Sequence, residues 1–112
     1  MIFYNFFFTF LDVWTDSTKT WDDTGLRLNV EGATDATTSK DGSVVIIREY
    51  QKAYLWKSNS GKSVIDILRG QRCHINVGPD RQGESIALNP DGKSYFTHSE
   101  YVNQVLWKFT IN

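Results

Sequence analysis

The chain of 112 residues has one cysteine, no concentration of charge of one sign and no long hydrophobic run. With Cys73 alone it forms neither an internal disulfide nor a cysteine-based metal site. Twelve Lys and Arg are scattered singly among thirteen Asp and Glu, for a net charge of −1. No basic stripe neutralises phosphates, which argues against a dedicated nucleic-acid binder. The aromatic residues 1–10 are too few to span a bilayer, which takes about 20 apolar residues, so we expect no membrane span.

The N-terminal segment also lacks the basic start and the small-residue cleavage site of a signal peptide. We therefore expect residues 1–25 to form an irregular segment or an edge strand. Its acidic, Thr-rich part, residues 15–25, lacks the Asp-x-Asp-x-Asp-Gly spacing of a calcium loop, and a solvated loop is predicted. Trp14 and Trp21 near its ends are candidate binding-surface residues, with a structural role as the alternative.

What the chain does have is apolar and aromatic content, 40% and 14% of its residues, enough for one domain with a modest core. After residue 25 short alternating runs are separated by turn signals, which predicts an all-β fold. The expected strands are residues 26–30, 33–39, 43–49, 53–56, 73–77, 84–89, 94–98 and 104–111. Cys73, at the start of one alternating run, is expected to be a small buried hydrophobe.

Two turns divide the chain into similar halves. Asp41-Gly42 and Asp91-Gly92 lie fifty residues apart, and each predicts a hairpin with a type I′ turn. Each is followed by an apolar strand and then by an aromatic-rich strand, ending Leu55-Trp56-Lys57 or Leu106-Trp107-Lys108. A period of about 40–50 residues with several strands per unit is typical of propeller blades.

A short helix is predicted between the halves, over residues 63–70. Ser63 and Asp66 make a possible capping box, and Gly70 ends the segment. We expect two consecutive antiparallel four-stranded blades, about 26–70 and 71–112, connected by this helix.

The ordered motifs across residues 26–109 resemble WD40-like (TolB-type) β-propeller proteins, in particular the closing blades of secreted or cell-surface propellers. The motifs are Thr34-Asp35-Ala36, Ser39-Lys40-Asp41-Gly42, residues 45–50, Ala53-Tyr54-Leu55-Trp56, residues 82–87, Pro90-Asp91-Gly92, Tyr95, Thr97 and Ser99-Glu100. The resemblance implies a secreted or cell-surface protein that acts as a non-catalytic scaffold for a protein or glycan ligand. A full propeller takes at least four blades, so we expect either part of a larger propeller or a ring completed by self-association.

The sequence Gly83-Glu84-Ser85-Ile86-Ala87 resembles a nucleophile elbow. That motif needs a strand-to-helix turn after the serine, whereas Pro90, five residues on, leaves no room for a helix. His98 is expected one strand away, and no Asp is placed to orient it. We therefore expect a structural role for Ser85.

Glu84 is the carboxylate most open to a function. Calcium-dependent phytase-like propellers have a metal-binding Glu in a similar Glu-Gly-x-Ala setting, which this sequence matches imperfectly. Calcium needs six to eight oxygen ligands, to which Glu84, Asp35 and Glu100 contribute if a complete ring brings them together. Capping of backbone donors is the alternative role for Glu84. The rival functions are a metal-dependent phytase-like or esterase-like hydrolase, and a truncated product without activity of its own.

Overall fold

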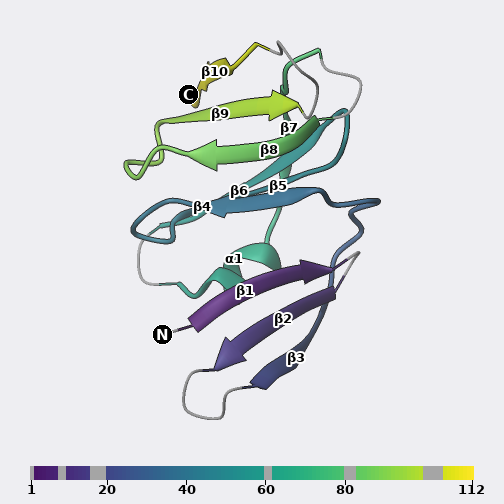
Figure 1. Ribbon diagram of the computed structural model, residues 1–112. Coiled ribbons are helices and arrows are strands. Elements are labelled where there is room, and N and C mark those ends of the chain that lie inside the picture. The colour runs from purple at the N-terminus through teal and green to yellow at the C-terminus, as the bar shows by residue number, and fades with distance from the viewer. Residues whose placement is uncertain (1, 8–9, 16–19, 60–61, 80–82, 100–104) are drawn as a thin grey trace.

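The structure is a computed structural model of the whole chain. It describes the backbone of residues 2–7, 10–15, 20–59, 62–79, 83–99 and 105–112, and within these ranges the side chains from residue 24 onward except that of Glu84. This part of the chain consists of three antiparallel β-sheets and one short helix (Figure 1), which confirms the predicted all-β class. Among the described residues, no helix is long and apolar enough to cross a membrane.

The N-terminal sheet replaces the irregular segment or edge strand expected over residues 1–25. Its strands are β1 (Ile2–Phe7), β2 (Phe10–Thr15) and β3 (Thr20–Arg27), in that order. Aromatic and β-branched residues favour strands, but Phe8-Thr9 between the first two strands are not turn-forming residue types, so no hairpin was predicted there. Trp14 and Trp21 lie opposite each other in the β2–β3 register, so they belong to strands and not to the predicted loop.

The central sheet contains β4 (Asp35–Thr38), β5 (Val44–Arg48), β6 (Ala53–Lys57) and β7 (Cys73–Ile75), in that order. Every residue of β5 is buried. This is expected of a strand covered on both faces, and alternate β5 residues enter two different cores.

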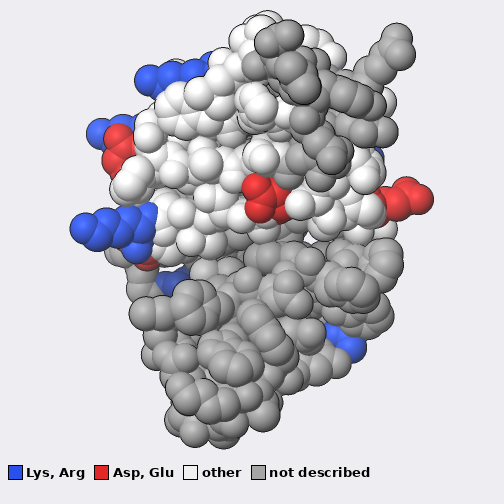
Figure 2. Space-filling view, in the orientation of Figure 1, with Lys and Arg blue, Asp and Glu red and all other residues white. Residues whose placement is uncertain are grey.

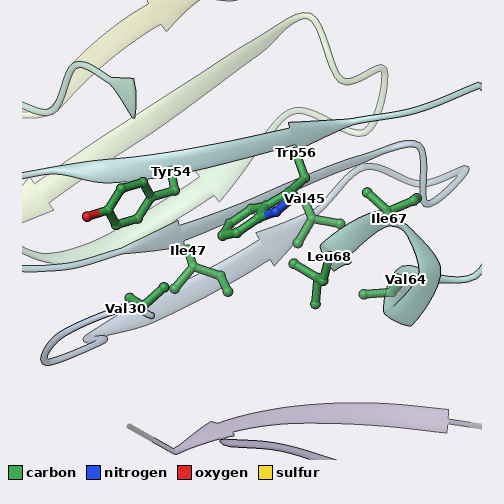
Figure 3. Close-up of a cluster of buried hydrophobic side chains, with 8 residues drawn as sticks. All are labelled: Val30, Val45, Ile47, Tyr54, Trp56, Val64, Ile67 and Leu68. Atoms are coloured by element: carbon green, nitrogen blue, oxygen red, sulfur yellow. The ribbon is translucent and has the colours of Figure 1, made fainter. Parts of the chain in front are cut away.

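The first core lies between the central sheet and α1 (Val64–Leu68), as Figure 3 shows. Its buried members are Val30, Val45, Ile47, Tyr54, Trp56, Val64, Ile67 and Leu68. Ser63 is the N-cap of α1, which confirms the serine half of the predicted capping box: its hydroxyl oxygen accepts the Asp66 N–H at 3.2 Å and its hydroxyl donates to Asp66 Oδ2 at 2.9 Å. The cap fixes where the helix begins, and the helix then covers one face of the sheet.

The C-terminal sheet contains β8 (Gly83–Leu88), β9 (Ser94–Ser99) and β10 (Trp107–Thr110), ordered β10-β9-β8. Within the described residues it has three strands, where a four-stranded blade was expected. Its inner face and the central sheet form the second core, whose buried members are Val44, Ile46, Ala53, Leu55, Ile86 and Tyr95.

The two predicted hairpins share one hydrogen-bond pattern. In the first hairpin Ser39 N–H donates to Val44 C=O, Gly42 N–H to Ser39 C=O, and Ser43 N–H to Asp41 Oδ1. In the second hairpin the corresponding bonds run from Asn89 N–H to Ser94 C=O, from Gly92 N–H to Asn89 C=O, and from Lys93 N–H to Asp91 Oδ1. All three pairs of corresponding bonds are fifty residues apart, so the two hairpins have the same local geometry.

Neither turn is centred on its Asp-Gly pair as predicted, and the second turn is not type I′. The bond from Gly92 N–H to Asn89 C=O makes Pro90 and Asp91 the central residues, and the proline ring fixes φ near −65°, whereas type I′ needs positive φ. Gly42 and Gly92 instead follow the turn with φ of 75° and 70°, as in hairpins where a left-handed glycine comes after the turn.

The Leu-Trp-Lys triplets that marked the third strands are also not equivalent. Trp56 pairs with Val45, and it is Phe109, not Trp107, that pairs with Tyr95, fifty residues after Val45. The β9–β10 connection, residues 100–106, is three residues longer than the β5–β6 connection, residues 49–52. Because the triplets lie 51 and not 50 residues apart, the observed register differs by two from the one in which the triplets are equivalent. An even shift leaves the same residues facing the core.

Candidate functional site

The central and C-terminal sheets meet where β4 lies beside β8 (Figure 1). Asp35 Oδ2 accepts the Ile86 N–H at 2.8 Å, and two residues on Thr37 Oγ1 accepts the Leu88 N–H at 3.1 Å. Alternate residues of a strand face the same way, so side chains of β4 satisfy successive outward donors of β8. This closes the β8 edge against other strands.

The Asp35 carboxylate is therefore occupied by backbone donors, since its Oδ1 accepts the Ala36 N–H at 2.8 Å. Glu84 lies on β8, two residues before Ile86, with its side chain outside the described part, and Glu100 lies outside it altogether. Where the structure describes side chains, no three His, Cys, Asp or Glu come together as a metal site. The calcium site stays a prediction, and Asp35 joins the two sheets.

Ser85 and His98 are opposite each other in the β8–β9 register, a pairing the sequence reasoning did not predict. Ser85 lies within a strand that continues to Leu88, and not at the strand-to-helix turn of a nucleophile elbow. Its carbonyl accepts a hydrogen bond of 2.8 Å from Nη1 of the buried Arg48. The strand position of Ser85 does not match the elbow, and the structural role expected for its side chain stays a prediction.

The two sheets pack head to tail. The face of the central sheet that carries Asp35, Thr37 and Ile46 contacts the C-terminal sheet. The residues fifty positions later, Ser85, Ala87 and Phe96, lie on the face of the C-terminal sheet turned away from the central sheet, because Ile86 and Tyr95 between them face inward. Equivalent faces therefore point the same way in both units.

We call this outward surface of the C-terminal sheet, formed by Ser85, Ala87, Phe96, His98 and Lys108, the receiving face. Ser85 and Ala87 are exposed, Phe96 is half-buried, and the Lys108 ammonium lies 5.8 Å from the Phe96 ring centroid. Between described elements, the packing of the C-terminal sheet involves β4 and β5, on its inner side. The space-filling view in Figure 2 shows few charged side chains over β8 and β9.

A groove of about 400 Å³ opens between the two sheets at their outer strands. Its lining is Leu55, Lys57, Cys73, His74, Ile75, Asn76, Tyr95, Phe109, Thr110, Ile111 and Asn112. Tyr95 stacks on Phe109 at 5.1 Å between ring centroids and donates its hydroxyl to the Asn76 carbonyl at 2.6 Å. Burial raises the pKa of Tyr95 to about 12. The hydroxyl therefore stays protonated and can donate to the Asn76 carbonyl of the other sheet's connection.

Cys73 lines this groove and is exposed, so the prediction of a buried small hydrophobe is wrong. Its strand does alternate, with Ile75 packed against the second core. However, β7 has three residues and lies at the sheet edge, and nothing described covers Cys73 there. Its Sγ lies 3.7 Å from the Leu55 carbonyl oxygen.

Comparison with protein-family models, with curated proteins and with solved structures finds no match for this chain.

Proposed function

We propose that the chain is a non-catalytic interaction scaffold, a section of a head-to-tail stack of β-sheets of the kind found in WD40-like propellers. The observation that carries the proposal is the equivalence of faces: the side of the central sheet that holds the C-terminal sheet recurs on the C-terminal sheet as the receiving face. A head-to-tail contact leaves one face of each kind unpaired at the ends of the assembly, so further units can be added through the same contact.

The ligand of the receiving face is a β-sheet of another copy of the chain. The N-terminal sheet lies at the far end of the molecule from the C-terminal sheet (Figure 1), and the molecule measures 42 × 27 × 24 Å. Among the described elements the N-terminal sheet therefore does not cover the receiving face, which leaves that face accessible to a second copy. Phe96 and Ala87, cross-strand neighbours on the receiving face, supply apolar surface for the contact.

Light scattering on a sizing column tests this proposal. We expect the mass of the wild-type chain to rise with concentration, and Phe96→Asp to remove the rise because it places a charge in the contact. Tyr50→Asp is the matched control, since Tyr50 is 47% exposed in the β5–β6 connection, away from the receiving face. A monomer at every concentration, or equal loss of association in both variants, contradicts the proposal.

A further inference from the structure

We propose that the groove and the open edge of β10 together bind an extended peptide segment, which pairs with β10 as the fourth strand of the C-terminal sheet. This goes beyond the proposed function, because it concerns the outer edge of that sheet and not its receiving face.

The first support is the difference in strand number between the two repeats. In the central sheet β7 pairs with β6, with Cys73 opposite Leu55. The register makes β10 the equivalent of β6, but within the described residues β10 is the edge of its sheet. The groove lies where inward side chains of a fourth strand would go, between Ile75 on one side and Phe109 on the other.

The second support is that backbone groups of β10 point away from β9 toward the open edge. Ile111 N–H donates to the Lys93 carbonyl at 2.9 Å, on the β9 side. Because backbone groups alternate along an antiparallel strand, the N–H and C=O groups of Lys108 and Thr110 point to the open side. On β8, by contrast, side chains of Asp35 and Thr37 already take the outward donors.

The third support is an exposed apolar run where β10 begins. Val105, Leu106 and Trp107 are 57%, 61% and 37% exposed. Exposed apolar side chains gathered in one place mark interaction sites in soluble proteins, and these three adjoin the open edge.

The lining defines the chemistry of the ligand. Leu55, Ile75, Phe109 and Ile111 form apolar walls, and Lys57 adds a positive charge, whereas none of the eleven described lining residues is acidic. A strand presents alternate side chains to one face. The ligand is therefore a segment of a partner protein with apolar side chains at alternate positions and a carboxylate near Lys57.

The test uses three capped heptapeptides with Glu at both ends and Val, Leu or Phe alternating with Thr between them. Binding to the ¹⁵N-labelled chain is followed by NMR. We expect at least one peptide to shift the amide resonances of Cys73 and Ile75 and to slow hydrogen exchange at Lys108 and Thr110.

Two variants at one position separate strand pairing from groove filling. Thr110→Pro removes an outward donor and is tolerated at an edge, whereas Thr110→Val keeps the N–H. We expect the proline variant to bind about tenfold more weakly, and the valine variant to stay within about twofold of wild type.

The role of the Lys57 charge is tested by Lys57→Glu, which should reverse the preference between peptides ending in Glu and otherwise identical peptides ending in Lys.

Absence of binding by all three peptides overturns the inference. The inference is also overturned if the peptides bind equally well to both Thr110 variants and do not slow hydrogen exchange at Lys108. That result would mean that the groove takes up apolar groups without strand pairing, as it would for a small apolar ligand. Protection of Lys108 and Thr110 in the free chain that grows with concentration would assign the edge to a second copy. Phe96→Asp, on a different surface, leaves the expected peptide binding unchanged, so failure here is distinct from failure of the proposed function.

Discussion

Asp35 accepts hydrogen bonds from backbone donors of two strands, which gives its carboxylate a structural role that can be tested beside the predicted metal-binding one. Removing its carboxylate in Asp35→Ala leaves the half-buried Ile86 and Ala36 N–H groups without acceptors. We expect the free energy of unfolding to fall by about 1–3 kcal/mol, measured by urea denaturation. Adding millimolar calcium should leave the wild-type melting temperature unchanged, because only a bound ion stabilises the folded state. A rise in melting temperature that Asp35→Ala abolishes would restore the calcium site.

Asp41 gives a prediction for the dependence of stability on pH. The Ser43 backbone N–H, the Ser43 hydroxyl and the Ser39 hydroxyl donate to its carboxylate and lower its pKa from 3.8 to about 2. A lowered pKa in the folded state contributes stability above the unfolded value of 3.8, and this is lost as the pH falls toward 2. The stability difference between wild type and Asp41→Ala should therefore shrink over this range. In Ser43→Ala the carboxyl should titrate at higher pH by NMR; an Asp41 midpoint near 3.8 in wild type would contradict the account.

The two hairpins are alike in backbone but differ in surroundings, which makes their glycines a matched pair. Both have positive φ, so an alanine at either position is strained by about 1–2 kcal/mol. A Cβ on Gly42 meets nothing within 4 Å, whereas on Gly92 it lies 3.2 Å from Val44 Cγ2 and 3.3 Å from Ser39 Cβ. We expect Gly92→Ala to lower the unfolding midpoint more than Gly42→Ala, because it also pushes the two hairpins apart. Equal losses would mean that the second hairpin moves freely against the first.

Local signals predicted most of the elements after residue 25. The Ser63 cap and the Asp-Gly turns are encoded within a few residues, so the helix and both hairpins were found from sequence. The N-terminal sheet was missed because Phe8-Thr9 does not signal a turn. The register of β10 was misjudged because connection lengths, and not matching triplets, set the strand pairing.

The candidate site was less predictable, since it depends on how the sheets stack. The sequence suggested Asp35 as a calcium ligand, but it did not predict that the Asp35 carboxylate accepts the Ile86 N–H, 51 residues away. In the part of the chain that the structure describes, the C-terminal sheet has one strand fewer than the central sheet and the groove lies beside its outer strand, and no residue pattern predicts such a difference in strand number. Cys73 is exposed because the short strand β7 lies at the edge of the central sheet.

At the scale of the whole molecule, β5 belongs to both cores and should couple them. Ile46 and Ile47 are adjacent and buried to the same degree, but Ile46 lies in the second core and Ile47 in the first. Replacing either with alanine removes similar apolar volume, and we expect each to cost about 2–5 kcal/mol. If the two cores unfold together, both variants lower the midpoint of one common transition. Hydrogen exchange of the α1 amides, beside the first core, and of the β9 amides, beside the second, measures this. Were Ile47→Ala to loosen α1 while β9 kept its wild-type protection, the sheets would be separate folding units that merely touch.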